Sequence, residues 1–531
     1  MAFDDIFKYI GEFGPYQRRT LLLLSLPGII VAFHRLAGVF LHAKVEHRCQ
    51  LPFEGPNSTY RIDEQSLNAS YPRDGEKWSS CEVFPLNYSN WYTDEEISVN
   101  GTIKCSSWVY DKSTYDSSIV SEFNLVCDNV WLRATADALF MLGDVLGALI
   151  FGDLSDRYGR KPIFFTSLVL QIAAGLLGSF APEYISYVIA RMVIGATTDG
   201  VFLIIYVIGM ELVAPKKRLL AGMHFILMFS LGYVLLTAIA FFVRDWRMLQ
   251  IAVTLPASLF LCYWWVIPES PRWLITKGKV DEARSLLLKV AKWNKVNIPE
   301  STMEDILQPQ NQDYKSSVFD LLRWPNMRKN SLILFYIWFV NSCTYYGLSW
   351  NTSNLAGNAY IIFVIAGAVE FPANILILLT LNRWGRKIIQ SGSLIIGGVA
   401  LLLTLAVPVD MTWLTIMFVM IGKMAITASF TTIYMFSAEL FPTVVRNVGI
   451  GASATCARIG GMMAPYINLL GNSAPPVTFG ALTFTAGLLA LILPETLGKT
   501  LPDTIEEGEQ FGKKTSAPDT TYYDNKAFSP P

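Results

Sequence analysis

Nine ionisable side chains inside long apolar stretches of this sequence are candidates for chemistry. A charge in an apolar interior is costly unless an opposite charge or water meets it. Both signs occur among the nine, so we expect internal ion pairs around a water-filled cavity. The nine residues are His34, Arg35, Asp137, Asp144, Asp199, His224, Glu370, Lys423 and Arg458.

Arg458 carries the most specific chemistry of this set. Its planar guanidinium can grip a carboxylate or sulfate through two parallel hydrogen bonds, which favours an anionic or zwitterionic ligand. The alternative is a structural pair with Glu370 or Asp199. Asp199 in turn could attract a cation, or could neutralise Arg458 or Lys423. Together the two polarities favour a zwitterion, or a bulky ion of either sign.

Aromatic side chains accompany these charges. The face of such a ring stabilises an organic cation by about 0.5–2 kcal/mol, whereas helix packing or lipid contact is the alternative role for each ring. Tyr345, Tyr434 and Phe33 are the rings that we expect at a binding site. The other rings that qualify are Trp338, Phe339, Tyr346 and Phe430.

The composition places these residues in a membrane. Of 531 residues, 52% are hydrophobic and 16% are charged, with a mean hydropathy of +0.37, whereas about 25% of a soluble domain is charged. The net charge is −1, so no electrostatic field favours nucleic acid. These values exclude a soluble enzyme and a disordered scaffold. We expect an all-α membrane protein with the lipid bilayer around it.

Twelve apolar stretches are long enough to cross a bilayer as helices, which need about 20 residues each. A membrane barrel would instead show alternating strands of about 10 residues. The stretches lie near 20–42, 132–152, 162–181, 184–213, 219–242, 247–267, 331–350, 357–381, 388–407, 411–440, 447–470 and 476–494.

Positive charge in the short loops fixes the expected orientation. Lys and Arg gather in 157–161, 216–218 and 383–387 and at Arg446, all on one side of the membrane, although Arg244 and Arg247 depart from the pattern. We therefore expect a multi-pass protein of the plasma membrane with both termini in the cytoplasm. Its expected parts are an N-terminal segment 1–19, a first six-helix half 20–267 with an outer loop 43–130, a cytoplasmic loop 268–330, a second half 331–494 and a tail 495–531.

The outer loop has the chemistry of an oxidising compartment. It holds Cys49, Cys81, Cys105 and Cys127, which predict two disulfides with three connectivities left open. Four glycosylation sequons begin at Asn57, Asn68, Asn87 and Asn100. On the opposite side, an amphipathic pattern over 279–293 predicts a surface helix, and the polar composition from about residue 503 onward predicts disorder.

An internal repeat indicates the architecture. The run 156–161 recurs at 382–387 and Pro268-Glu269-Ser270 recurs at 494–496, both at an offset of 226 residues. Glu211 and Arg218 recur as Glu439 and Arg446 at an offset of 228. Two such six-helix halves around a central cavity form the major facilitator fold.

The repeated motifs place charges at the membrane edge, where acids can pair with arginines and tie neighbouring helix ends together. Such pairs would hold one conformation and break as the halves rock, so we expect them to form an inner gate. An ordinary positively charged loop is the alternative. The residues of this gate are Asp156, Arg157, Arg160, Glu211, Arg218, Glu439 and Arg446.

These motifs resemble the organic cation, anion and zwitterion family of solute carriers, within the major facilitator superfamily, over nearly the whole chain. Sugar porters share the turn and Pro-Glu-Ser motifs but lack the outer loop. The N-terminal run 11–17 most resembles insect organic cation transporter-like members, although many members have six loop cysteines and an acid in place of Asn382. The supporting segments are 108–111, 118–120, 122–127, Pro268-Glu269-Ser270-Pro271-Arg272-Trp273-Leu274, 438–447 and 494–497.

The resemblance implies a carrier of small organic ions that works by alternating access, as a uniporter or an exchanger. Anion and carnitine-type members carry Arg at the position of Arg458, whereas vertebrate cation carriers carry Asp there; several relatives carry Lys near Asp199. Organic cations or zwitterions such as carnitine-like compounds are the expected substrates, and an organic anion is the alternative. A receptor or scaffold that does not transport is the alternative from a different class.

No cofactor, metal or enzymatic function is expected. The run 498–500 lacks the first glycine of a nucleotide-binding loop, and the glycines at 449 and 451 lie in an apolar span with no strand before them. The four histidines show no metal-ligand spacing. The sequence leaves open whether the chain forms a homo-oligomer.

Replacing Asp156 with alanine tests the gate. Loss of an acid from the motif is expected to weaken the closed inner gate and lower turnover. Uptake is measured at equal surface expression, and unchanged uptake would count against this role.

Overall fold

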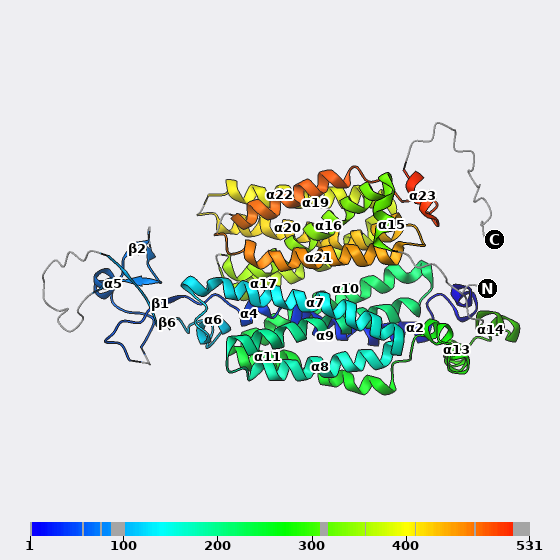
Figure 1. Ribbon diagram of the computed structural model, residues 1–531, viewed down its shortest axis with the longest axis horizontal. Helices are drawn as coiled ribbons and strands as arrows, with labels where there is room; N and C mark the ends of the chain where they lie inside the picture. The colour runs from blue at the N-terminus through cyan, green and yellow to red at the C-terminus, as the bar shows by residue number, and fades with distance from the viewer. Residues whose placement is uncertain are drawn as a thin grey trace.

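The computed structural model describes residues 3–55, 58–74, 77–85, 101–307, 317–355, 357–408, 410–471 and 474–512. Long helices lie side by side in a bundle, and a small segment with β-strands projects from one end (Figure 1). The last helix, α23 (Ile505–Gln510), lies at the opposite end, and so does the N-terminus of the chain. We call these two ends the loop end and the terminal end.

Ten helical spans in the described residues are long and apolar enough to cross a membrane. Two further helices, α21 and α22, occupy the last two predicted stretches. The spans consist of α2 (Pro15–Ser25), α3 (Pro27–Leu36) and α4 (Gly38–Leu41), α7 (Val130–Tyr158), α8 (Arg160–Ser179), α9 (Tyr184–Glu211), α10 (Arg218–Phe242), α11 (Trp246–Thr254) with the 3₁₀ helix Leu255–Trp265, α16 (Pro325–Trp350), α17 (Ala359–Ala368) and α18 (Glu370–Trp384), α19 (Arg386–Leu403), α20 (Thr412–Leu440), α21 (Arg446–Ile467) and α22 (Ala474–Ala490).

Several helices extend beyond the apolar stretches that predicted them. The first begins at Pro15 rather than at residue 20, because proline suits the first turn of a helix. The seventh span begins at Pro325 rather than at residue 331 for the same reason. Helix α7 continues through charged residues to Tyr158 and stops at Gly159, whose φ is +112°. Hydropathy therefore marks the apolar core of each helix but not its ends.

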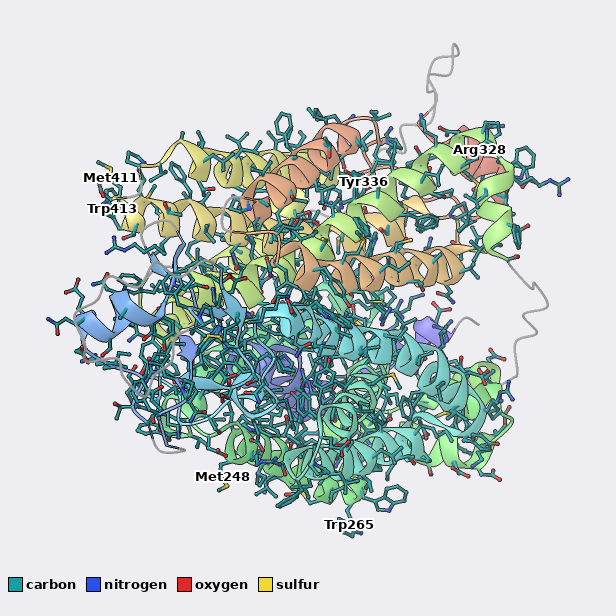
Figure 2. The ribbon with its side chains drawn as sticks, turned by 60° about the vertical axis from the view of Figure 1, so that its left-hand side comes forward. Met248, Trp265, Arg328, Tyr336, Met411 and Trp413 are labelled. Atoms are coloured by element: carbon teal, nitrogen blue, oxygen red, sulfur yellow. A yellow bond between two sulfur atoms is a disulfide. The ribbon has the colours of Figure 1, made fainter. Side chains whose placement is uncertain are left out.

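Large apolar side chains cover the outside of the bundle. Trp265 is 82% exposed and Trp413 is 65% exposed, and both point away from the helices (Figure 2). A soluble surface rarely presents so much contiguous apolar area. The exposed rings are therefore suited to lipid.

The segment between the first two spans folds as three two-stranded antiparallel sheets joined by disulfides. Bonds Cys49–Cys105 and Cys81–Cys127 confirm the prediction of two disulfides and select one connectivity. The strands pair as β1 (His47–Cys49) with β6 (Trp108–Tyr110), β2 (Arg73–Asp74) with β3 (Lys77–Trp78), and β4 (Glu82–Val83) with β5 (Ile103–Lys104); helices α5 (Glu64–Ser70) and α6 (Ile119–Glu122) complete the segment.

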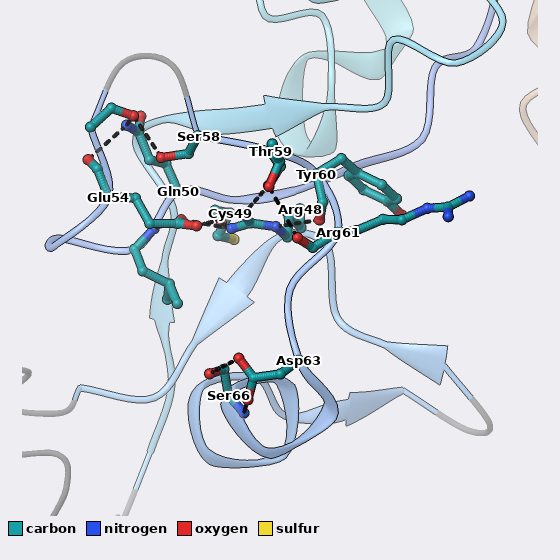
Figure 3. A network of polar contacts seen from close by, with 12 residues as sticks. Arg48, Cys49, Gln50, Glu54, Ser58, Thr59, Tyr60, Arg61, Asp63 and Ser66 are labelled. Carbon is teal, nitrogen blue, oxygen red and sulfur yellow. Dashed lines mark hydrogen bonds and ion pairs between the residues drawn. The ribbon is translucent and has the colours of Figure 1, made fainter.

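A buried arginine organises this segment (Figure 3). Arg48 forms an ion pair with Glu54, and it donates hydrogen bonds to the carbonyl oxygens of Thr59 at 2.6 Å and Tyr60 at 2.8 Å. One side chain thus holds a loop of the chain closed. Of the four sequons, Asn68 is exposed on α5, while Asn57, Asn87 and Asn100 lie outside the described residues.

At the terminal end, α13 (Val280–Asn294) confirms the predicted amphipathic helix and packs on the N-terminal segment. Asn294 Nδ2 donates to the carbonyl oxygen of Ile10 at 2.8 Å, and Asn294 Oδ1 accepts from the backbone N–H of Tyr16 at 3.0 Å. The other helices of this region are α1 (Phe7–Ile10), α12 (Pro271–Thr276), α14 (Glu300–Leu307) and α15 (Val318–Arg323).

The prediction of disorder from about residue 503 onward was wrong for α23. Glu509 accepts hydrogen bonds from the backbone N–H groups of Asn326 at 2.8 Å and Met327 at 3.1 Å, so it caps the start of α16. Thr504 caps α23 itself by accepting from Glu507. The polar composition suggested a solvated tail, but the Glu509 carboxylate instead satisfies backbone N–H groups at a helix N-terminus. The residues from 513 onward lie outside the described part.

The sequence repeat is also a structural repeat. Glu269 accepts from the first backbone N–H groups of α8, at Arg160 (3.0 Å) and Lys161 (3.1 Å). Glu495 does the same for α19 at 2.9 and 3.1 Å. A carboxylate at a helix N-terminus satisfies unpaired N–H donors and opposes the helix dipole. Each half is thus tied together by its own Pro-Glu motif.

Burial alone would raise the pKa of Glu495, but backbone N–H donors lower it below its ordinary value. The contribution of Glu495 to stability is therefore present above the ordinary pKa of a carboxyl group and is lost as the pH falls through the lowered value. The donors are Arg386, Lys387, Thr496 and Leu497.

Replacing Glu495 with glutamine is expected to lower the unfolding temperature at neutral pH and to flatten its decline in acid. The purified protein is unfolded thermally in detergent between about pH 3 and pH 6. Glu282→Gln, on an exposed face of α13, is the control and should behave as wild type. An equally steep acid decline in wild type and Glu495→Gln would contradict the assignment.

Candidate functional site

Four charged side chains meet near the middle of the bundle. Arg35 Nη2 lies 2.7 Å from Asp144 Oδ1 and 2.8 Å from Asp199 Oδ1. Arg458 Nη2 lies 2.8 Å from Asp199 Oδ2, and Arg458 Nε lies 3.4 Å from Asp144 Oδ2. Each carboxylate therefore presents one oxygen to each arginine, and the four charges sum to zero. We call these residues the charge quartet.

The charge quartet joins the two halves. Arg35, Asp144 and Asp199 come from α3, α7 and α9 of the first half, whereas Arg458 comes from α21 of the second. Both carboxylate side chains are 4% exposed, while the arginines are 13% and 18% exposed. Desolvation costs several kcal/mol per ion, so removal of one member leaves an uncompensated buried charge.

Tyr434 shows that solvent reaches the charge quartet. Its side chain is 42% exposed, although its ring centroid lies 4.4 Å from that of the fully buried Trp338. It also interacts electrostatically with Arg458 and with Arg35 of the opposite half. Tyr434 on α20 therefore faces the space between the halves rather than lipid. Tyr346 also lies beside the charge quartet, where it accepts a hydrogen bond from Arg35 Nη1 at 3.2 Å.

A second charged group lies deeper, in the second half. Lys423 Nζ is 3.3 Å from Glu370 Oε1, and each side chain is 1–2% exposed. The Lys423 ammonium also sits 3.3 Å from the centroid of the Tyr345 ring, a cation–π contact. Tyr345 donates to Glu370 Oε1 at 2.6 Å, and Ser230 of the first half donates to Glu370 Oε2 at 2.7 Å. We call the ion pair of Glu370 and Lys423, together with the donors Tyr345 and Ser230, the inner pair.

The family model "Sugar (and other) transporter" matches residues 97–507. An organic cation transporter protein of Drosophila melanogaster is 52% identical, over 98% of this chain and 97% of its own length. Organic cation/carnitine transporter 2 of Homo sapiens is 35% identical, over 95% of this chain and 93% of its own length.

The chain belongs to the sugar (and other) transporter family. The resemblance to organic-ion solute carriers is thereby confirmed, and this protein is a membrane transporter rather than an enzyme. The xylose transporter XylE of E. coli, in a partially occluded inward-open conformation, shares the fold, with a TM-score of 0.62 and 17% identity over 92% of this chain and all of that chain. The expected major facilitator fold is confirmed.

In this transporter the predicted binding residues fall into two groups. Arg458 and Asp199 lie in the charge quartet with Tyr434 at its edge. Glu370, Lys423 and Tyr345 form the inner pair. Phe33 is 4% exposed and lies in the hydrophobic core.

Arg35 and Asp144 were predicted as intramembrane charges but not as residues of the binding site. Their stretches are apolar on all sides, so spacing could not show which face of each helix turns inward. Ser230 carried no signal, because its side chain is not ionised near neutral pH, and Tyr346 was named only among the further aromatic candidates. Their roles follow only from the packing of helices that are distant in sequence.

The expected gate residues lie at the terminal end. In the first half Arg160 pairs with Asp156 and lies 3.9 Å from Glu211, while Arg157 pairs with Asp153 on an exposed face at 2.8 Å. These pairs tie α7, α8 and α9 together within one half.

The second half repeats this arrangement with a residue that sequence analysis missed. Arg386 holds both carboxylate oxygens of Glu439, at 2.9 Å each. The offset of 226 residues from Arg160 was the signal that could have found it. Arg446 instead donates to the carbonyl oxygen of Phe441 and, at 3.0 Å, to Thr443 Oγ1. Arg218 begins α10.

One group of potential metal ligands occurs in the described residues: His47, Cys81 and Cys127. The two sulfurs are joined in a disulfide, so no thiolate is available to bind a metal. This cluster gives the outer segment a covalent link rather than a metal site.

A double-mutant cycle tests the link between the halves. Asp199→Asn is expected to destabilise the protein by about 3–5 kcal/mol, because it leaves a buried arginine unpaired. Adding Arg458→Gln should restore most of this loss, since Arg35 and Asp144 then remain balanced. Thermal unfolding in detergent is the measurement.

Glu300→Gln, which removes an exposed partner of Arg284, is the control and should cost less than about 1 kcal/mol. A double variant whose loss equals the sum of the single losses would contradict a direct pair.

Proposed function

We propose that this transporter carries organic cations or zwitterions, such as carnitine-like compounds, by alternating access between its two halves. It acts as a uniporter or an exchanger in the plasma membrane, with the loop end outside and both termini in the cytoplasm. The charge quartet and the inner pair set its preference for charge. The single observation that carries the proposal is the neutral charge quartet at a solvent-reached position between the halves.

The charges on the page favour a substrate that offers both signs. The charge quartet and the inner pair together contain three basic and three acidic side chains, so their charges balance. A purely anionic substrate would pair with Arg458 but would leave Asp199 without its arginine partner. A zwitterion can take both roles at once, so its carboxylate replaces an aspartate and its ammonium replaces an arginine. Each buried charge then keeps a partner throughout.

Tyr345 supports the recognition of a substrate cation. Its ring face already holds an ammonium, that of Lys423, at 3.3 Å, and such faces bind alkylammonium groups well. Phe430 and Tyr434 lie close by, with ring centroids 5.8 Å from Tyr345 and 5.9 Å from Phe430 respectively. These rings give an adaptable apolar wall for the organic part of a substrate.

The names of similar proteins point the same way. The relative from Drosophila melanogaster is described as an organic cation transporter, and the human relative as an organic cation/carnitine transporter. An organic anion is the alternative substrate, since Arg458 offers a bidentate grip. An organic anion bound to Arg458 would displace Asp199, and the charge of that buried carboxylate would lose its Arg458 partner.

The arrangement of the halves supports alternating access. At the loop end Thr135 of α7 lies 3.1 Å from the Tyr466 hydroxyl of α21, and aromatic rings of both halves meet there. This end is closed, whereas Tyr434 is reached by solvent. Release or uptake at the loop end therefore requires these contacts to separate. The disulfides and the sequons support an outside location for this end.

Uptake of three labelled compounds by expressing cells tests the proposal: an organic cation, a carnitine-like zwitterion and an organic anion. Saturable uptake of the cation or zwitterion is expected. Arg458→Asp should reduce zwitterion uptake at least tenfold, because it removes the carboxylate partner and adds a third acid.

Lys499→Ala, near the tail, is the control at equal surface expression. Uptake of the anion alone would contradict the proposed substrate class. Cation uptake that Arg458→Asp leaves unchanged would make Arg458 a structural residue only.

A further inference from the structure

A short helix of the first half closes the seam at the loop end. Helix α4 places Phe40 against two rings of α17 in the second half, with centroids 5.6 Å from Tyr360 and 4.8 Å from Phe363. Tyr115 of the outer segment and Phe241 of α10 pack on the same Tyr360 ring, at 6.0 and 5.6 Å. The position of α4 therefore decides whether this seam is sealed.

Helix α4 is anchored by a buried polar chain that the transport site does not use. His42 Nδ1, at the end of α4, lies 2.9 Å from Asp137 Oδ1 of α7. His42 Nε2 lies 2.7 Å from the Tyr187 hydroxyl of α9. All three side chains are buried, at 1%, 7% and 0% exposure respectively. The chain joins the sealing helix to two helices of the same half.

The backbone of α4 is pressed against this carboxylate. A Cβ atom at Gly38 would lie 2.6 Å from Asp137 Oδ1, so glycine lets the backbone approach this carboxylate closely. The backbone N–H of His42 donates to the carbonyl oxygen of Gly38 at 2.9 Å. The carboxylate that binds His42 thus also lies against the backbone of α4, so a change in the bond between His42 and Asp137 acts on α4 at two points.

We propose that His42, between Asp137 and Tyr187, is a proton-binding site that controls the seal at the loop end. Neutral His42 donates from Nδ1 to Asp137 and accepts from the Tyr187 hydroxyl at Nε2. A proton taken up at Nε2 converts the ring to an imidazolium, and the Tyr187 hydroxyl rotates to accept. The bond to Asp137 becomes an ion pair, which is about twice as strong as a neutral hydrogen bond.

The surrounding charges direct the proton to the imidazole. Arg133 and Arg191 both interact electrostatically with Asp137. Arg191 is 1% exposed and lies over the Phe140 ring at 4.5 Å. The other titratable or charged groups packed around the site are His34 of α3, Lys44 after α4, Tyr184 of α9 and, beyond Trp246, Arg247 of α11.

The consequence is a carrier whose outside opening is slowed by acid. Imidazole is the side chain that changes charge between about pH 5 and pH 8. With His42 charged, Phe40 is held in the seam and the loop end stays closed. With His42 neutral, the anchor is weaker and the seam opens more often. This inference concerns the seal and holds whatever ion the carrier transports.

Cross-linking across the seam tests the site without any substrate. Thr135→Cys and Tyr466→Cys are introduced together, with serine at Cys262, Cys343 and Cys456, and a short thiol-specific cross-linker reports closure. The cross-linked fraction at about pH 6 relative to about pH 8 is compared with that of the same chain carrying His42→Gln. We expect this ratio to be about fivefold higher with His42 present.

Uptake in cells gives the second readout. Uptake per surface carrier should fall about fivefold from about pH 8 to about pH 6 and stay within about a factor of two in His42→Gln. His47→Gln, the other imidazole of the loop end, is the matched control and should keep the wild-type dependence. If cross-linking behaves as expected but no uptake occurs, the proposed function fails while the proton site stands.

Tyr187→Phe provides a second test in case the His42→Gln protein does not reach the cell surface. It removes the acceptor for the added proton, so the midpoint of the pH profile should move to lower pH. Equal cross-linking ratios with and without His42, a midpoint unmoved by Tyr187→Phe, or a pH dependence lost in His47→Gln would each overturn the proposal.

Discussion

A charge cannot remain unpaired in an apolar interior without a large desolvation cost, and the core of this transporter is arranged around that constraint. Arg35 and Arg458 carry two positive charges between the halves, and Asp144 and Asp199 neutralise them in alternation. This pairing joins the halves because Arg458 comes from the second half and the other three residues come from the first. A carrier built in this way must supply replacement partners whenever its halves move apart. Substrate charge is one such partner, and water is the other.

The rest of the bundle keeps each half intact while this central contact changes. Glu269 and Glu495 cap the starts of α8 and α19, one in each half. Arg160 and Arg386 bind acids of their own half at the terminal end. Rigid halves joined by few polar contacts are what rocking motion requires. At the loop end the contacts between the halves include stacked and edge-to-face aromatic rings, at Phe40, Tyr360 and Phe363.

Much of this architecture could be predicted from the sequence. Hydropathy gave twelve spans because lipid requires long apolar helices, and the offset of 226 residues revealed the duplication. The pairing of Arg458 with Asp199 was one of two predicted partnerships, but Glu370 proved to be the partner of Lys423. Spacing along one helix cannot choose between such partners, because the choice depends on how separate helices are rotated. For the same reason Arg35 and Asp144 were not assigned to the site. The helix at 505–510 was missed because its acids find partners only at the start of α16.

Equilibrium binding of a carnitine-like zwitterion to the purified carrier tests the central claim most directly. The account predicts that Asp199→Asn/Arg458→Gln, which removes one charge of each sign, lowers the affinity for the zwitterion at least tenfold while costing much less stability than Asp199→Asn alone. Two unpaired charges on the ligand would then find no partners in the site. Binding of the zwitterion to this double variant with wild-type affinity would contradict the claim that substrate takes the place of partners within the charge quartet.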